Sequence, residues 1–374
     1  MHDLHQLPPN TVHLYTMMGK HVTRLPYTAC DWTESLKQPG SMNVTLDLSA
    51  DTVRMGLWQS LHPWKCMLAL QNGLQVKHAG PVTDIQWDAK SRRMQVTCGG
   101  GLTLLTKRLV LRHELKTQWR DRQLKVDEKN PEPNMRLEYR RTWWWAICVR
   151  LIEETKQWAD LPIDLPTVTG PGDKQRTYYS WDLATVADRI SDIMGLEGGN
   201  ELRFDPYIDE ETGDLRFQFV YGTPYLVTAE HQWSAAAPDS RIDLVSVKSA
   251  GTALTTQVWA TGGKDADKTL ICRRTATPDD GYMLMQSSDT SHTTVTRLST
   301  LQQQAQARLA AGYYPTESFE LQVGEEYDVH VGDHADVRVS DDWIGDETLN
   351  LKITDIHGSV DSDMLTVTAV ERST

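Results

Sequence analysis

The chain has few cysteines and no long apolar segment. Its five cysteines, among 374 residues, are widely spaced and odd in number, and no Cys-x-x-Cys pair occurs. This spacing predicts neither a zinc site nor a disulfide framework, and it favours small buried thiols in a protein made in a reducing cytoplasm. No apolar run reaches the roughly 18 residues of a transmembrane helix. The first residues also lack the basic and apolar regions of a secretory leader.

Motifs of catalysis and cofactor binding are missing too. The sequence contains no Gly-x-Ser-x-Gly and no His-Glu-x-x-His, and the glycine-rich segment 98–108 lacks the Gly-Lys-Ser/Thr of a phosphate loop. We expect a bend there, after a strand. Acidic residues stand in adjacent pairs at Glu210/Glu211, Glu325/Glu326 and Asp341/Asp342. Adjacent carboxylates do not face each other across a sugar, so we expect solvated turn acids, no enzyme activity and no cofactor.

One segment, VHVGDHADVRV at residues 329–339, carries several residue types that can bind a metal. They are His330, Asp333, His334 and Asp336. The pattern reads as a strand, a turn and a second strand, which places the two histidines on different strands. No third ligand is evident nearby, so the segment predicts no metal site.

The net charge of −13 is unevenly distributed along the chain. Residues 1–160 hold 22 Lys/Arg against 16 Asp/Glu, or +6, and residues 161–374 hold 16 against 35, or −19. The strongly acidic second half of the chain argues against a nucleic-acid clamp, because such a clamp needs cations along the phosphates. It indicates either a well-solvated surface or a surface that must not bind DNA.

Aromatic usage is unusual, with 13 tryptophans against four phenylalanines. Three of the tryptophans are adjacent, at 143–145. Residues 138–160 repeat apolar side chains at helical spacing, at Trp144, Ile147, Cys148, Leu151, Thr155 and Trp158. This predicts a core helix with Trp144 on the buried stripe and Trp143 and Trp145 on its flanks. A contact with a partner is the main alternative, because the apolar segment is too short for a membrane.

The first hundred residues read as strands. Met42, Val44, Leu46 and Leu48 alternate with polar residues, and CMLAL, QNG and LQVKHAGPV follow one another as strand, Asn-Gly turn and strand. Short strands with glycine-rich turns predict an antiparallel sheet that closes into a small barrel or sandwich.

Two further helices are expected. The first follows an N-cap at Ser180 or Asp182, carries Leu183, Val186, Ile190 and Ile193 on one face, and stops at Gly195. The second carries Leu298, Leu301, Ala305 and Leu309 and ends at Gly312. A hairpin with its turn at residues 212–214 lies between them, and alternating strands complete the chain after residue 315.

These patterns predict a mainly β protein with an α+β insert. The expected domains are an N-terminal β-barrel (1–112), an inserted α+β domain (113–240), return strands with a helix (241–314) and a C-terminal β-barrel (315–374).

The order of these elements resembles phage tail hub proteins, the minor tail or baseplate hub proteins of long-tailed phages, in particular the actinobacteriophage type. The resemblance rests on LPYTACDWTESLKQPGSMNVTLDL and the strands that follow it, on YYSWDLATVADRISDIMGLEGGNELRFDPYI, on TTQVWATGG, and on VGDHADVRVSDDW with LNLKITDIHGSVDSDMLTVTAV. It covers nearly the whole chain and consists of patterning and order.

The resemblance implies a non-catalytic virion protein of the tail tip, assembled in the host cytoplasm. Such hubs are homotrimers with two barrels in each subunit, so that six barrels form a ring that joins the sixfold tail tube to the threefold tip and surrounds the DNA-ejection channel. The implied partners are the tail tube or distal tail protein, the tape measure protein, and tip or receptor-binding proteins carried by the insert. No sequence-specific binding to nucleic acid is implied.

Physical reasoning agrees with this resemblance. Subunits hide open strand edges by closing rings, and an acidic lining would let DNA slide through a channel. We expect subunit or partner contacts at Trp143, Trp145 and Trp343. The alternative is a cell-surface carbohydrate-binding β protein of the tail tip, which predicts tryptophans clustered with Asp or Asn on one face. An enzyme acting on cell-wall polymer is a third class, with no carboxylate pair to nominate.

Overall fold

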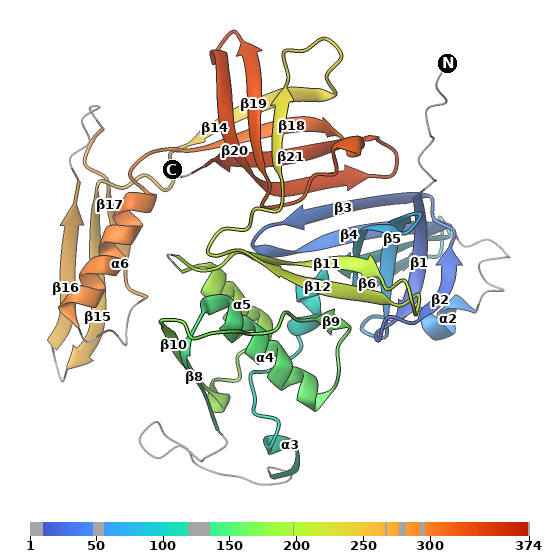
Figure 1. The fold of residues 1–374 in the computed structure, drawn as a ribbon, viewed down its shortest axis with the longest axis horizontal. Helices are drawn as coiled ribbons and strands as arrows, with labels where there is room; N and C mark the ends of the chain where they lie inside the picture. The colour runs from blue at the N-terminus through green and yellow to red at the C-terminus, as the bar shows by residue number, and fades with distance from the viewer. Residues whose placement is uncertain are drawn as a thin grey trace.

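The computed structural model describes residues 10–47, 56–118, 135–196, 198–265, 268–276, 282–291, 295 and 297–372 (Figure 1). Strands dominate these residues, and the longer helices lie in the middle of the chain and near residue 300. The expected mainly β class with an α+β part is therefore confirmed.

The N-terminal part of the chain forms one half of a large sheet. Its strands are β1 (Asn10–Thr16), β2 (His21–Leu25), β3 (Ala29–Ser35), β4 (Gln38–Asp47), β5 (Cys66–Asn72), β6 (Gln75–Asp88) and β7 (Arg93–Gly99), with a short helix α2 (Leu57–Ser60). They run in the order β2-β1-β5-β6-β7-β4-β3, and every pair is antiparallel. Along strands such as β4, every second side chain is buried in the core.

Two sequence predictions for this half are confirmed. β5 and β6 form the expected hairpin, with Gly73 at a φ of 64° in its turn. Met42, Val44 and Leu46 of β4 are at most 1% exposed, as their alternation requires. The fourth member of that series, Leu48, lies outside the described residues.

The C-terminal half of the sheet is built around long antiparallel strands. It contains β13 (Glu230–Ser234), β14 (Ile242–Ala250), β18 (Thr316–Gly324), β19 (His334–Asp341), β20 (Gly345–Ser359) and β21 (Met364–Glu371), with a short helix η3 (Glu325–Tyr327). Their order is β14-β18-β21-β20-β19-β13, and only β13 runs parallel to its neighbour.

β20 joins the two halves into one sheet. Its first part pairs with β19, and residues 355–359 pair with residues 35–31 of β3 in the N-terminal half. In Figure 1 the red and orange strands of the C-terminal half accordingly lie beside the blue β3. A single hydrophobic cluster contains residues of both halves, such as Leu14 and Val367.

The expected barrels do not close among the described strands. β2, β13 and β14 each pair with one neighbour only, so the ladder of backbone hydrogen bonds ends at these strands. In the described part of the chain, the two predicted barrels are two halves of one open sheet.

The middle of the chain forms an α+β unit. It contains η1 (Gly101–Leu105), α3 (Leu115–Gln118), β8 (Arg136–Thr142), α4 (Trp144–Trp158), β9 (Ile163–Asp164), β10 (Lys174–Tyr179), η2 (Ser180–Asp182), α5 (Val186–Met194), β11 (Leu202–Ile208) and β12 (Leu215–Tyr221). β8 pairs with β10, and β12 lies between β11 and β9. A second hydrophobic cluster fills the unit around α4 and α5.

The helix predicted over residues 138–160 starts later than expected. Residues up to Thr142 belong to β8, and Arg141, with a positive φ of 51°, lies where the register between β8 and β10 shifts. The buried stripe is rotated as well: Trp145 is 7% exposed, whereas Trp144 is half-buried. The prediction that Trp144 is the buried residue and Trp145 a flanking one is therefore wrong.

The helix after residue 180 also begins later than predicted. Its N-cap is Thr185, whose hydroxyl accepts the backbone N–H of Asp188 while the Asp188 carboxylate accepts the N–H of Thr185. Ser180 and Asp182 lie in η2, and Leu183 is 61% exposed because it precedes the helix. The stop at Gly195 and the β11–β12 hairpin are confirmed.

A small third unit lies between β14 and β18. It consists of β15 (Gln257–Asp265), β16 (Lys268–Thr275), β17 (Gln286–Asp289) and α6 (Leu298–Ala311), which covers the sheet. Leu301, Ala305 and Leu309 are buried as predicted, and the helix ends at Gly312. Leu298 is 47% exposed, against the prediction, because it is the first residue of the helix. The domain boundaries expected from the sequence stay a prediction.

The five cysteines are all free and buried, as their spacing predicted. Within the described residues, the structure has no helix that is both long enough and apolar enough to cross a membrane.

The glycine-rich segment after β7 connects the sheet to the α+β unit. It bends there as predicted, with β7 ending at Gly99 and η1 beginning at Gly101. A Cβ on Gly101 would lie 2.5 Å from Cβ of Phe204 and 2.9 Å from Cδ1 of Phe217. Glycine is required at this position by close packing of the two units, which brings β11 against the N-terminal half of the sheet.

Candidate functional site

The seam where the two sheet halves meet the α+β unit contains the buried charged side chains Glu201 and Asp333. Glu201, just before β11, is 7% exposed and pairs with Lys352 of β20. The same carboxylate accepts the backbone N–H of Leu226 at 2.8 Å. Arg203 of β11 donates to the carbonyl of Val331 at 2.7 Å. Side chains of the α+β unit are therefore bonded directly to the C-terminal half.

Asp333 organises the loop side of this seam. Its carboxylate is fully buried and accepts the hydroxyl of Thr228, the backbone N–H groups of Ala229 and His330, both at 3.0 Å, and lies 3.2 Å from Nε2 of His231. Burial alone would raise the pKa of Asp333, but these hydrogen bonds, above all that of Thr228, bring it below its ordinary value.

The four candidate metal ligands at residues 330–336 are not brought together. His330 lies in the loop before β19, which corrects its expected place on a strand, and Asp333 is occupied by its hydrogen bonds. His334 and Asp336 both contact the guanidinium of Arg372. These side chains therefore form an ion pair and hydrogen bonds at the start of β19.

Two hollows lie in the seam. One is a small cavity of about 50 Å³, and the other is a pocket of about 410 Å³ that opens beside it. Both are lined by Glu34 of β3 and by Asp205 of β11. The larger pocket is also lined by Glu325, Glu326 and Asp328, so its wall carries several carboxylates.

The carboxylates of this pocket form ion pairs and hydrogen bonds across the seam. Lys77 of β6 lies 2.5 Å from Oε2 of Glu325, and Gln75 donates to Asp328 at 2.9 Å. Glu325 was expected to be a solvated turn acid, but it is largely buried because η3 packs against β6. Glu210/Glu211 and Asp341/Asp342 are exposed in turns, as predicted.

Glu34 is the most perturbed carboxyl group of the seam. Burial raises its pKa to about 7, and Asp205 adds to the rise while Arg203 opposes it. His78, which lines the same small cavity, stacks on Trp32, and its burial lowers its pKa to about 4. The cavity therefore holds a neutral imidazole beside a carboxyl group that titrates near neutral pH. No local motif signals this cavity, because Glu34, His78 and Asp205 come from β3, β6 and β11, which are far apart in sequence.

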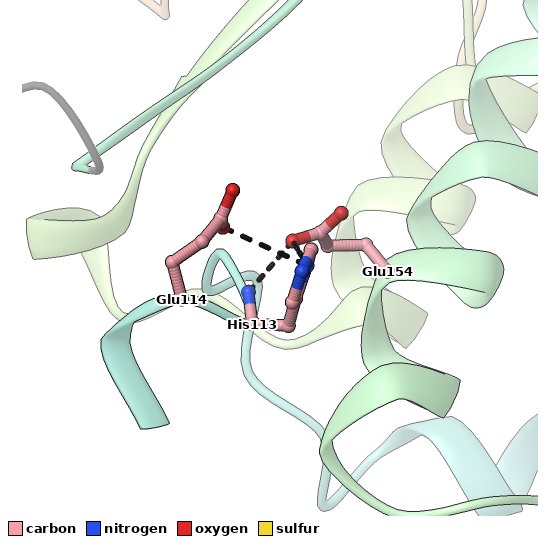
Figure 2. A group of neighbouring side chains, drawn as sticks. All are labelled: His113, Glu114 and Glu154. Atoms are coloured by element: carbon pink, nitrogen blue, oxygen red, sulfur yellow. Dashed lines mark hydrogen bonds and ion pairs between the residues drawn. The ribbon is translucent and has the colours of Figure 1, made fainter. Parts of the chain in front are cut away.

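A second cluster of titratable groups links the segment before α3 to α4 (Figure 2). Oε1 of Glu154 accepts both the backbone N–H of His113, at 2.7 Å, and Nδ1 of its ring, at 2.9 Å. Candidate ligand atoms of His113, Glu114 and Glu154 lie within 4.8 Å of one another. Both oxygens of Glu114 are taken by the guanidinium of Arg112, which lowers the pKa of that carboxyl group.

This His113 cluster is explained by its hydrogen bonds. With Glu114 engaged by Arg112, His113 and Glu154 are the two groups left, and structural and catalytic zinc sites use three or four protein ligands. The contacts fasten residues 112–114 to the middle of α4.

The three adjacent tryptophans lie at the start of α4 in three environments. Trp145 stacks on Tyr221 with ring centroids 4.2 Å apart, Trp144 lies under Arg176, and Trp143 is 41% exposed. A contact of Trp145 with another subunit stays a prediction, and its ring has an intramolecular partner. A shallow pocket of about 500 Å³ opens beside these rings.

Trp343 is the most exposed large apolar side chain in the described residues, at 90%. It lies in the turn between β19 and β20, where its backbone N–H donates to Oδ1 of Asp341 at 2.8 Å. The backbone is therefore held in place while the indole projects into solvent.

Two solved structures share this architecture over almost the whole chain. The 43 kDa tail protein of prophage MuSo2 from Shewanella oneidensis aligns with a TM-score of 0.56 at 12% identity, covering 97% of this chain and 98% of that one. The tail protein from Neisseria meningitidis MC58 aligns with a TM-score of 0.54 at 14% identity, covering 97% of both chains.

The chain has the fold of a phage tail protein. The resemblance drawn from the sequence is confirmed at the level of the fold, and its actinobacteriophage type is not tested. No known family profile matches the sequence, and no curated protein matches it.

The seam of this tail-protein fold makes stability depend on pH through Glu34. Folding raises the pKa of Glu34 from its ordinary 4.5 to about 7, so the folded chain binds this proton more tightly than the unfolded chain. The stabilising contribution is complete below pH 4.5 and is lost as the pH rises through 7. We expect Glu34→Gln to raise the melting temperature at pH 8 and to leave it nearly unchanged at pH 4.5.

The matched control is Glu210→Gln, which removes an exposed turn carboxylate. It should keep the pH dependence of the parent protein. Melting curves at pH 4.5, 6, 7 and 8 compare the three proteins, and parallel curves for Glu34→Gln and the parent would contradict this account of the seam.

Asp333 should have the opposite pH dependence. Its pKa is depressed in the folded state, so its contribution is present above the ordinary carboxyl pKa and is lost as the pH falls through the folded value. Asp333→Asn removes the buried charge. It also replaces one accepting oxygen with an NH2 group, which cannot accept the backbone N–H groups that the carboxylate now binds. We expect a loss of about 2–4 kcal/mol in urea unfolding at pH 7.

The partly exposed ion-pair member Asp336 offers the control for this experiment, since Asp336→Asn should cost less than about 1 kcal/mol. Equal urea midpoints for Asp333→Asn and Asp336→Asn would show that Asp333 does not hold the loop side of the seam.

Proposed function

We propose that the protein is a structural component of the phage virion, the homotrimeric hub at the tail tip. It joins the sixfold tail tube to the threefold tip and forms part of the channel through which DNA is ejected. The proposal is supported by a fold shared with phage tail proteins and by the two-part sheet. It assigns the chain a role in assembly and no catalytic reaction.

The observation that carries the proposal is the junction of β3 with β20. It fixes two β halves side by side in one subunit, so three subunits present six β halves. This number matches a sixfold tube on one side and a threefold tip on the other.

The open strands of each subunit supply the contacts for such a ring. β2 and β14 end the sheet, and each exposes an apolar side chain, Val22 at 45% and Val245 at 51%. Unpaired edges of this kind attract further strands, and closure with neighbouring subunits protects them. We assign Trp343 to a subunit or partner contact, because large aromatic side chains contribute strongly at the centres of interfaces.

The charge distribution suits a DNA channel. Residues 161–374, which include the whole C-terminal half of the sheet, carry 35 acidic against 16 basic residues. A bore lined by this half would repel phosphates and would not retain the genome. The partners in this arrangement are the tail tube or distal tail protein, the tape measure protein, and tip or receptor-binding proteins.

The mass of the purified chain in solution tests the proposal. Light scattering across a concentration series should give a species of three times the chain mass, seen as a ring in electron micrographs, with or without added tail tube protein. Trp343→Ala should keep the melting temperature and weaken association by about tenfold or more, as loss of one central aromatic contact does.

Leu74→Ala is the matched control, since Leu74 is 77% exposed in another hairpin turn. It should change neither folding nor association. A chain that remains monomeric both alone and in the presence of tail tube protein would overturn the hub assignment.

A further inference from the structure

The start of α4 holds a pocket that lies apart from the β3–β20 junction on which the hub proposal rests. The chain passes from β8 into α4 at Trp143, which keeps an extended backbone with φ −102° and ψ 157°. Trp144 and Trp145 are the first two helical residues. This change of backbone direction sends three consecutive indoles to different positions around one hollow, which all three tryptophans line.

Each of the three indole rings has a packing partner within the chain. Trp143 packs on the backbone of Gly172, where an added Cβ would lie 2.7 Å from the indole. Trp144 contacts the guanidinium of Arg176, 5.2 Å from its centroid, and Trp145 stacks on Tyr221. A preformed aromatic surface costs little conformational entropy when a ligand binds.

The floor of the pocket is fixed by Asn200. This side chain is 5% exposed, and its Oδ1 accepts the backbone N–H of Trp145 at 3.0 Å while its amide donates to the carbonyl of Gly222. Asn200 thereby caps α4 from a distant part of the sequence. Both polar atoms of the Asn200 amide are engaged in these bonds, so other residues must form the hydrogen bonds to a ligand.

The rim of the pocket carries those groups. Asp173 and Lys174 lie side by side, with Oδ2 and Nζ 2.9 Å apart, and their side chains are 69% and 36% exposed. They offer an acceptor and a donor beside the indoles. Among the described residues, no hydrogen-bond acceptor meets the indole N–H of Trp143, whose side chain is 41% exposed, so this donor is available as well.

The lining selects the class of ligand. Besides the tryptophans, the described residues that line the pocket are Asp, Lys, Asn, Gly, Thr and Pro, and none of them is Leu, Ile, Val, Met or Phe. An apolar side chain of a partner protein would find Pro224 as the one aliphatic contact among these described residues. A pyranose instead presents an apolar C–H face that fits a flat indole, with hydroxyl groups around it that fit Asp173 and Lys174.

We propose that this tryptophan pocket binds a hexopyranose unit of a saccharide. The sugar stacks on Trp143, the exposed ring, and its hydroxyls bond to the carboxylate of Asp173 and the ammonium of Lys174. Among the described residues of the lining, Asp173 is the single carboxylate, whereas glycoside hydrolysis uses two, so the proposal is for binding. Such a site would let the tail tip attach to a cell-surface glycan.

The test is binding of defined sugars to the full chain. A panel of methyl hexopyranosides and their di- and trisaccharides is titrated and followed by saturation-transfer NMR. At least one saccharide should bind saturably, and Trp143→Ala should weaken it by about tenfold or more while the melting temperature stays the same. Asp173→Ala should weaken it too.

Trp87→Ala is the matched control, because it removes another exposed indole, 45% exposed in β6, and should leave saccharide binding unchanged. Absence of saturable binding across the panel would overturn the proposal, as would equal loss in Trp143→Ala and Trp87→Ala. A pocket that takes a peptide of another tail protein and no saccharide would also overturn it. Sugar binding is measured whatever the oligomeric state, so its failure is distinct from failure of the hub assignment.

Discussion

The pairing of β3 with β20 is the interaction on which the rest of the structure depends. Five residue pairs join strands that are about 320 positions apart in the sequence, and they turn two β halves into one sheet with one core. Bringing such distant strands together has a high loop-closure entropy, which the shared core and the seam contacts must offset. Everything proposed for assembly follows from this fixed relation between the halves.

The seam between the three parts holds buried charged groups that are paired across it. Glu201, Lys352 and Asp333 are buried or nearly so, and each has partners from a different element. Removing one partner of such a group leaves an uncompensated charge, so the network favours one arrangement of the three parts over alternatives. Glu34 is the exception, since its burial beside Asp205 destabilises the charged form.

The sequence predicted those elements whose signals are local. The β5–β6 hairpin follows from Asn-Gly, and α6 follows from Leu301, Ala305 and Leu309 at helical spacing. The true cap of α5 was also visible, because Thr185 and Asp188 form a capping-box pattern.

What the sequence could not predict depends on contacts between distant residues. α4 begins at Trp144 because Asn200, 55 positions away, caps its Trp145 N–H, and that shift buries Trp145 in place of Trp144. The Glu34 cavity and the β3–β20 pairing have no local signal at all. The run of tryptophans in the sequence drew attention to the tryptophan pocket. Nothing in the sequence indicated that Asp173 and Lys174 would lie at its rim.

The central claim is that three copies of this two-part sheet form a ring around a DNA channel. An electron cryomicroscopy reconstruction of the assembled tail tip tests it most directly. The account predicts three copies of the chain, with β2 and β14 covered by neighbouring subunits and a bore lined mainly by Asp and Glu. A single copy per tail, or a bore lined mainly by Lys and Arg, would contradict it.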